Sequence, residues 1–210
     1  QINLAIAGIA VGTVSLPVLS KALKTKNLKK ISNIQNKSFE LSLLLSVPAS
    51  LGLILASEEI INALFGYGSF SKNDVALTAE ALKYFGFGVP AFALVKILSN
   101  FYFARDNTKT PFYISIFIVI LNIFISVSLF SKIGFIIIPI ATSISTWIGV
   151  FIYLYLLNLK KALLLKNHLM INFIKILVST ILMSLVLLLA LDSYANYLEY
   201  FYKYKAIYLI

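Results

Sequence analysis

The sequence contains no cysteine, a single histidine and few charged residues for its length. Without cysteine the chain can form no disulfide and no thiolate metal site. The one histidine, His168, cannot build a site that needs several histidines. Charged residues occupy only 12% of the 210 positions, too few to coat the exterior of a soluble domain. This shortage of charge excludes an ordinary soluble enzyme.

Apolar residues dominate instead, at 60% of the chain, and the mean hydropathy is +0.93. Runs of about 20 apolar residues can cross a bilayer as helices, and these runs lack the alternation of membrane-barrel strands. The sequence therefore predicts an all-α, polytopic transmembrane helical bundle with six spans and a truncated seventh. The predicted spans are residues 1–20, 39–56, 75–104, 111–130, 134–159, 169–191 and 197–210.

The net charge of +10 is explained by the topology of such a bundle. Six spans divide the loops into two alternating sets, and the set richer in Lys and Arg faces the cytoplasm. One set holds eleven basic residues: Lys21, Lys24, Lys26, Lys29, Lys30, Lys37, Arg105, Lys109, Lys160, Lys161 and Lys166. The other holds four basic residues and most of the acids: Lys72, Lys132, Lys203, Lys205, Glu58, Glu59, Asp74, Glu80, Asp192 and Glu199. The first set is predicted to be cytoplasmic.

The lysine-rich loop between residues 21 and 37 also carries Leu23, Leu28, Ile31 and Ile34 at nearly helical spacing. This pattern favours a short amphipathic helix on the membrane surface, with its lysines near anionic lipid. A specific anionic ligand is the alternative. Nucleic acid is disfavoured because no aromatic residue interleaves the lysines.

All five prolines lie in or beside predicted spans. Proline inside a helix removes a backbone hydrogen bond and kinks the helix. Pro17, Pro48, Pro90 and Pro139 are therefore hinge or kink candidates, and static packing is the alternative role for each. Pro111 is better placed to start a helix.

Lys96 is the most informative charge within a predicted span. It precedes Arg105, at the end of that span, by nine residues, or about 13 Å of helix. A lysine at this depth faces a cavity or a partner group. Lys96 is therefore a substrate-cavity candidate that could contact an anionic substrate, and a structural contact is the alternative.

Nothing in the sequence is typical of an enzyme. It has no Ser-His-Asp set, no glycine-rich phosphate loop and no cluster of metal-binding carboxylates. No complete span has an acid near its middle that could relay protons. We expect a transporting membrane protein without enzymatic activity, cofactor or metal.

Three segments resemble the MurJ (MviN) family of lipid II flippases. GIAVGTVSLPVLSK, Gly8 to Lys21, is similar to that family's eighth helix, and ALFGYGSFSKNDVALTAEAL, Ala63 to Leu82, is similar to an external loop. YFARDNTKTP, Tyr102 to Pro111, resembles the turn between its tenth and eleventh helices. Three motifs in the right order and at compatible spacing are a specific signal.

The resemblance implies a fold of fourteen helices in two lobes, of the multidrug/oligosaccharidyl-lipid/polysaccharide exporter superfamily. Since the chain begins and ends inside apolar stretches, we expect residues 1–210 to be a carboxyl-terminal fragment, helices eight to fourteen. The family implies that lipid II, an undecaprenyl-diphosphate-linked muropeptide, is moved by alternating access across the bacterial inner membrane for cell-wall synthesis. Its expected partners are lipid II, membrane lipids and the missing amino-terminal lobe.

The family's main cavity arginines would lie before Gln1, so an isolated copy of the chain is expected to be inactive. Within the chain, Arg105 and Lys109 are cytoplasmic-interface candidates near lipid phosphates.

Asn122 and Thr142 match two residues of a sodium site found in some members, but Ser126 stands where the family's Asp would be. Without that carboxylate, sodium coupling is expected to be absent or altered. Two alternatives to lipid II export remain open: an exporter of another lipid-linked saccharide or drug, and a non-transporting membrane scaffold.

Overall fold

A computed structural model describes Gly8 and residues 10–207, with the side chains of residue 167 and residues 194–207 left out of the description. This part of the chain is helical and contains no strand. The helices are α2 (Val11–Lys24), α3 (Leu28–Leu55), α4 (Ser57–Phe65), α5 (Lys72–Phe103), α6 (Lys109–Ile133), the short 3₁₀ helix η2 (Gly134–Ile136), α7 (Ile137–Leu159) and α8 (Asn167–Ile207). The all-α prediction is confirmed for the described residues.

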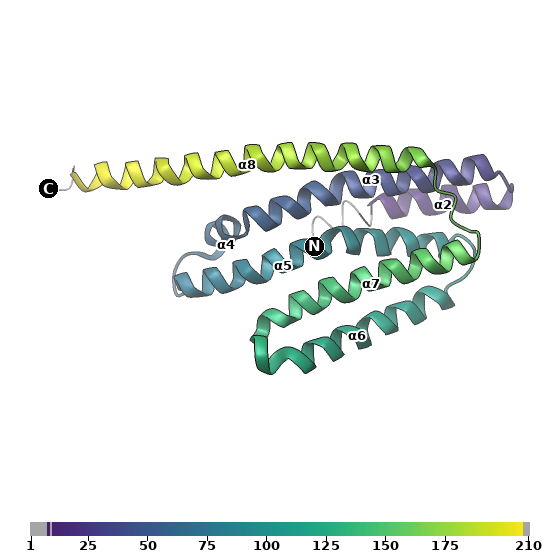
Figure 1. Ribbon diagram of the computed structural model, residues 1–210, viewed down its shortest axis with the longest axis horizontal. Helices are drawn as coiled ribbons and strands as arrows, with labels where there is room; N and C mark the ends of the chain where they lie inside the picture. The colour runs from purple at the N-terminus through teal and green to yellow at the C-terminus, as the bar shows by residue number, and fades with distance from the viewer. Residues whose placement is uncertain (1–7, 9, 208–210) are drawn as a thin grey trace.

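The long helices lie side by side along the long axis of the molecule (Figure 1). α8 packs on α3, α3 packs on α5, α5 packs on α7 and α7 packs on α6. α2 contacts both α3 and α5, and the short α4 covers the amino-terminal part of α5. α5 is thus the central helix of the bundle.

Local signals explain where several helices begin and end. Asn27 starts α3, because its side chain accepts a hydrogen bond from the Lys30 amide at 3.0 Å. Ser71 and Asp74 form a reciprocal capping box at the start of α5. Gly134 ends α6 with a φ of 73°, a left-handed conformation that costs glycine little. The chain then reverses through η2, so that α6 and α7 form an antiparallel hairpin (Figure 1).

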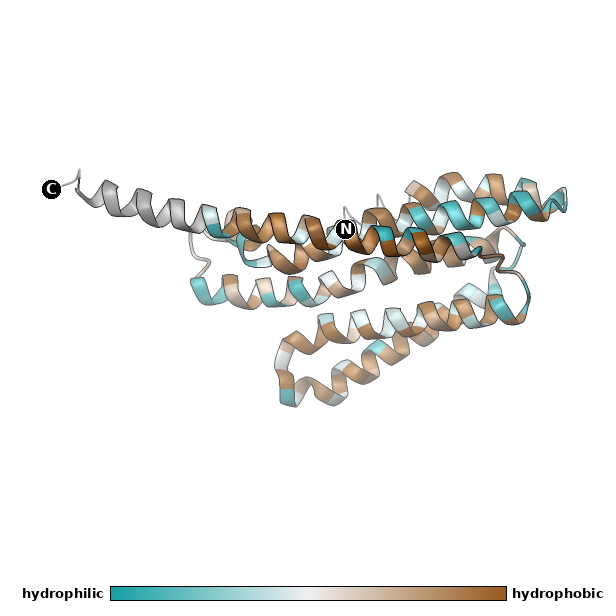
Figure 2. Cartoon of the chain, turned by 45° about the horizontal axis from the view of Figure 1, so that its top comes forward, coloured by the Kyte–Doolittle hydropathy of each residue, from teal (hydrophilic) through white to brown (hydrophobic). Residues whose placement is uncertain are grey.

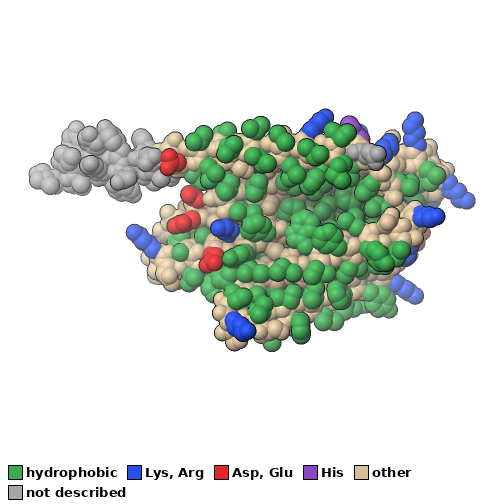
Figure 3. Space-filling view, viewed as in Figure 1, with side chains coloured by type: hydrophobic (Ala, Val, Ile, Leu, Met, Phe, Trp, Pro, Cys, Tyr) green, Lys and Arg blue, Asp and Glu red, His purple; other side chains and the backbone are tan. Residues whose placement is uncertain are grey.

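Four segments are long and apolar enough to cross a membrane, by length and composition: Leu28–Leu55, Lys72–Phe103, Lys109–Leu159 and His168–Ser193. The third of them comprises α6, η2 and α7 together. Large apolar side chains remain exposed along α6, α7 and α8. Hydrophobic residues predominate along these helices in Figure 2, and hydrophobic side chains cover much of the face seen in Figure 3. This surface suits lipid rather than water.

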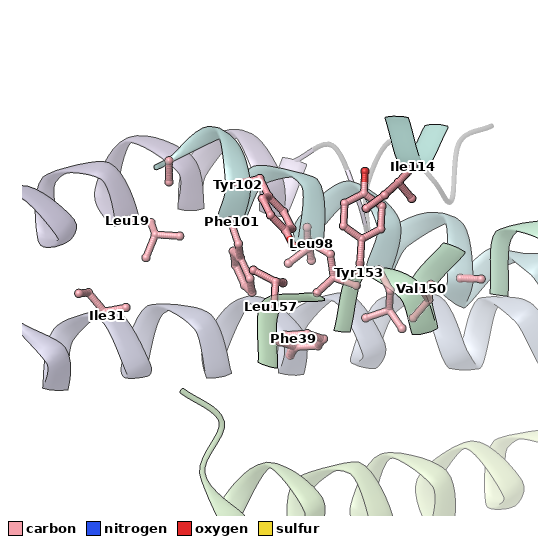
Figure 4. Close-up of a cluster of buried hydrophobic side chains, with 14 of the residues drawn as sticks. Leu19, Ile31, Phe39, Leu98, Phe101, Tyr102, Ile114, Val150, Tyr153 and Leu157 are labelled. Carbon is pink, nitrogen blue, oxygen red and sulfur yellow. The ribbon is translucent and has the colours of Figure 1, made fainter. Parts of the chain in front are cut away.

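The main core lies where α5 meets α2, α3 and α7 (Figure 4). Phe39 of α3 meets Phe101 of α5 edge to face, with ring centroids 5.8 Å apart. Tyr102 of α5 and Tyr153 of α7 are similarly close, at 5.9 Å. These aromatic pairs join three helices at one level and hold them together.

The lysine-rich loop does not form the separate surface helix that the sequence favoured. α2 continues to Lys24, residues 25–27 form the turn, and α3 runs unbroken from Leu28 to Leu55. Ser32, Gln35 and Asn36 of this first part of α3 are buried. The first part of α3 packs on the protein through these polar side chains, and it does not lie on lipid through an apolar face. This is why it continues into the rest of α3.

α8 also differs from the predicted spans. The sequence suggested a break between residues 191 and 197, but α8 is one helix from Asn167 to Ile207. Neither proline nor glycine occurs between these bounds to interrupt it. At the two ends of the chain, residues 1–7 and 9 of the first predicted span and residues 208–210 of the last lie outside the described residues.

The core makes a prediction about stability. Phe101 is fully buried, so Phe101→Ala should lower the free energy of unfolding by about 3–5 kcal/mol. Phe124→Ala, on the exposed face of α6 at 67% exposure, should change it little. The fluorescence of Trp147, the sole tryptophan, can follow the unfolding of both variants in detergent and so give their free energies of unfolding. Equal losses for the two variants would contradict this core assignment.

Candidate functional site

A cavity of about 1000 Å³ opens between α5, α6 and α7. Its apolar wall is largely aromatic, with Phe92 and Phe103 from α5, Phe112 and Tyr113 from α6, and Tyr153 from α7. Its polar side chains are Lys96, Ser99, Thr108, Lys109, Ser115 and Thr146. The cavity therefore combines two ammonium groups with walls of low dielectric constant, which strengthen the attraction for an anion.

Lys96 reaches this cavity from α5 at a point where α2 approaches closely. A Cβ atom on Gly12 of α2 would lie 2.5 Å from Asn100 Nδ2 and 3.8 Å from Lys96 Cγ. Glycine at position 12 is what permits this approach. Among the described residues no carboxylate forms an ion pair with the Lys96 ammonium group. Lys96 is an exposed residue of the cavity lining.

The turn after α5 brings Lys109 to the same cavity. Asn107 Oδ1 accepts a hydrogen bond from the Thr110 amide at 3.1 Å, and Asn107 Nδ2 donates to Thr110 Oγ1 at 3.0 Å. Asp106 adopts a left-handed φ of 56°, as Asp does more readily than most residues. This turn chemistry fixes the start of α6, where Lys109 is the first residue.

Arg105, in the same turn, binds backbone groups. Its Nη1 donates to Phe101 O at 2.5 Å and its Nη2 donates to Ala162 O at 2.7 Å. Burial lowers the pKa of the guanidinium, which nevertheless stays charged at neutral pH. Arg105 therefore ties the end of α5 to residues 160–166, the connector between α7 and α8. Sequence reasoning expected this side chain to meet lipid phosphates.

The connector is also held by three buried side chains of α3: Ser32, Gln35 and Asn36. Gln35 Nε2 donates to Ala162 O at 2.9 Å, and Gln35 Oε1 accepts from the Leu164 amide at 3.0 Å. Asn36 Oδ1 accepts from the Lys166 amide at 3.0 Å. Sequence reasoning missed this arrangement. The sequence did contain a sign of it: three uncharged polar residues recur at helical spacing within the lysine-rich segment, which is the pattern of a helix face that packs on other polar groups.

Asn122 and Thr142 are brought together across the α6–α7 hairpin. Asn122 Nδ2 donates to Thr142 Oγ1 at 2.8 Å, and the Thr142 hydroxyl donates to Ile138 O at 2.7 Å. Ser126 lies one helical turn from Asn122, and its buried hydroxyl has no hydrogen-bond partner among the described residues. The pair offers neutral oxygens only, which attract a cation weakly.

The proline candidates occupy different positions in their helices. Pro17, Pro48 and Pro90 lie inside α2, α3 and α5. Pro90 cannot donate to the carbonyl of Gly86, four residues earlier, and Ser50 Oγ donates to that carbonyl at 2.7 Å instead. Pro139 lies in the first turn of α7, where a helix needs no amide donor, so it is not placed to kink the helix.

The fold and its exposed apolar surface define the class of protein first: a multi-pass helical membrane protein. Comparison with known proteins then gives the particular family. The family model described as "Lipid II flippase MurJ" matches residues 1–208. The chain belongs to this MurJ family, and the resemblance read from its three motifs is confirmed. Flippases are transporters, so the family is not one of enzymes.

Individual relatives agree with the family match. The chain is 36% identical over 199 residues to the "Probable lipid II flippase MurJ" of Rickettsia prowazekii, covering 94% of this chain and 39% of that one. It is 37% identical over 158 residues to the protein of that name from Thermotoga maritima, covering 74% and 32%. The chain thus spans less than half the length of these relatives.

A solved structure described as "Lipid II flippase MurJ, inward closed conformation" has the same fold. Its TM-score to this chain is 0.78 at 27% sequence identity, and the alignment covers 90% of this chain and 38% of that one.

The bonds of the connector make a second prediction. Gln35→Ala would leave the Leu164 amide unpaired, which should cost about 1–3 kcal/mol. The connector carries Lys160, Lys161 and Lys166, so trypsin should cut it faster in this variant. Lys29→Gln, an exposed change on the same helix, should leave cleavage within the connector unchanged. Unaltered cleavage in Gln35→Ala would show that Gln35 does not hold the connector.

Proposed function

We propose that the chain supplies one helical lobe of a two-lobe transporter that moves lipid II from the cytoplasmic to the periplasmic leaflet of the bacterial inner membrane. The MurJ family match over residues 1–208 carries this proposal. The cationic cavity between α5, α6 and α7 supports it. Alternating access would expose the transported head group to each side in turn.

The distribution of charge supports an orientation for the lobe. The α2–α3 turn, the α5–α6 turn and the connector all carry basic residues and lie at one end of the bundle. Acidic side chains gather toward the other end on the face seen in Figure 3. We assign the basic end to the cytoplasm. α2, α3, α5, α6, α7 and α8 would then cross the membrane once each.

Lys96 and Lys109 are proposed to receive the diphosphate of lipid II. A diphosphate that leaves water needs cationic partners to offset its lost hydration. These two residues line the same cavity, one from α5 and one from α6, and no carboxylate of the described chain forms an ion pair with Lys96. Pro17 and Pro48 remain proposed hinges. For Pro90 the Ser50 hydrogen bond favours static packing instead.

Complementation tests the function and the role of Lys96 together. The chain, joined to the part of the Rickettsia prowazekii relative that the match leaves out, should restore lipid II export in cells depleted of their own flippase. Lys96→Ala should slow export on the order of tenfold, the loss expected for one charge-assisted hydrogen bond. Lys96→Arg should retain most of the rate because it keeps the charge.

Lys132→Ala is the matched control, because Lys132 is exposed at the far end of α6 and lies outside the cavity lining. A membrane-inserted fusion that exports no lipid II would contradict the proposed function. Export that survives Lys96→Ala unchanged would leave the function standing and assign Lys96 a structural role.

We also propose that the Asn122–Thr142 pair does not couple transport to sodium. Neutral oxygens alone do not offset the lost hydration of a cation, and Ser126 supplies a hydroxyl where a carboxylate would be needed. The melting temperature of the chain should therefore be equal in sodium and potassium chloride. Ser126→Asp should introduce a stabilisation specific to sodium. A sodium-specific stabilisation of the unaltered chain that disappears in Asn122→Ala would overturn this proposal.

A further inference from the structure

A second hollow surface lies between α3 and α8, on the other side of α5 from α6. It consists of two adjoining pockets of about 480 and 410 Å³ that share Lys37 and Glu40. We call them together the α3–α8 groove. Its α3 residues recur with helical spacing along one face, as do its α8 residues. One face of each helix therefore forms a continuous wall.

The half of the groove nearest the connector is basic. Lys30, Lys37, Lys166 and His168 line it, against the single carboxylate of Glu40. Glu40 accepts a hydrogen bond from Asn172 Nδ2 at 2.7 Å, and no ion pair joins it to these lysines in the described part of the chain. α8 begins here, so its first unpaired amides add positive potential. The excess of positive charge suits a phosphate group.

Lys166 of this basic half is held by two asparagine side chains of α3, one of them buried. Asn36 is only 7% exposed, and its Oδ1 atom accepts a hydrogen bond from the Lys166 amide at 3.0 Å. Lys166 Nζ donates to Asn33 Oδ1 at 2.6 Å. The Lys166 ammonium group is thus directed along the groove wall, where a flexible surface lysine would sample many positions.

The other half of the groove is largely apolar. Leu41 and Leu44 from α3 and Ile176 from α8 line it, together with Lys175 and with Asn172, Lys37 and Glu40 toward the basic half. An isolated phosphate ion would leave the apolar side chains without a partner. A molecule that fits both halves has an anionic head and a hydrocarbon chain.

We propose that the α3–α8 groove binds an anionic phospholipid, with its phosphate among Lys30, Lys37 and Lys166 and an acyl chain along Leu41, Leu44 and Ile176. This site is separate from the cavity that contains Lys96, and it goes beyond the proposed transport function. The bound lipid stabilises the contact between α3 and α8.

Native mass spectrometry of the chain released from detergent measures the binding. Phosphatidylglycerol should be retained in preference to phosphatidylcholine with the same acyl chains. Lys37→Gln combined with Lys166→Gln should weaken phosphatidylglycerol binding on the order of tenfold or more, as expected for the loss of two lysines near an anionic lipid. Lys21→Gln combined with Lys24→Gln, at the same end of the bundle but outside the groove lining, should change it less than about twofold.

Two further measurements distinguish a bound phospholipid from a bound free phosphate compound. Glycerol 3-phosphate, which has the anionic head without the chains, should not displace the lipid. Ile176→Trp should weaken phosphatidylglycerol binding without changing any charge, because the larger ring fills the apolar half. Displacement by glycerol 3-phosphate at the concentration of the lipid would identify a free-phosphate site and overturn the proposal. Equal retention of the two phospholipids would overturn it too.

Photo-crosslinking of the unaltered chain provides a test that does not depend on how variants fold. A phosphatidylglycerol with a photoreactive acyl chain should label residues 37–44 of α3 and 169–176 of α8. Label confined to other helices would contradict the site. Because neither measurement requires transport, failure of this proposal is distinguishable from failure of the proposed function.

Discussion

A buried backbone N–H or C=O group without a partner is costly, and a membrane protein has little water with which to satisfy it. The helices meet this demand through their own hydrogen bonds. The connector between α7 and α8 cannot, because it has no regular structure. Gln35 and Asn36 of α3 and Arg105 after α5 satisfy its carbonyl and amide groups instead. The position of α8 on α3 depends on these bonds, since the connector determines where α8 begins.

The same demand shapes the middle of α5. Ser50 of α3 donates to the carbonyl that Pro90 leaves free, and Ser143 and Trp147 of α7 donate to the carbonyls of Tyr84 and Phe87. Gly86 and Gly88 make room for this approach, because a Cβ on either would come within 3 Å of a neighbouring helix. The turn of α5 before Pro90 is therefore bonded to α3 on one side and to α7 on the other, which is consistent with the central place of α5 in the bundle.

Much of this fold could be predicted from the sequence, because long apolar runs and the placement of lysines report membrane helices and their loops directly. The continuous α3 could not, because Ser32, Gln35 and Asn36 find their partners some 130 residues later in the chain. The partner of Arg105 could not be predicted from the sequence either. Its position beside a turn suggested contact with lipid, and only the packed structure reveals the Ala162 carbonyl that it binds.

The candidate site was predictable in part. The depth of Lys96 in an apolar run suggested a cavity, but Lys109 belongs to another helix, and the Asn107–Thr110 turn is what places Lys109 at the lining of the same cavity. The α3–α8 groove lies beyond any local pattern because its charges come from segments more than 120 residues apart. The Ala162 carbonyl accepts from both Gln35 and Arg105, so one backbone group joins α3, which forms the groove, to the turn that carries Lys109. The two basic sites therefore share a support, and neither α3 nor the α5–α6 turn can move relative to the connector without breaking a bond to it.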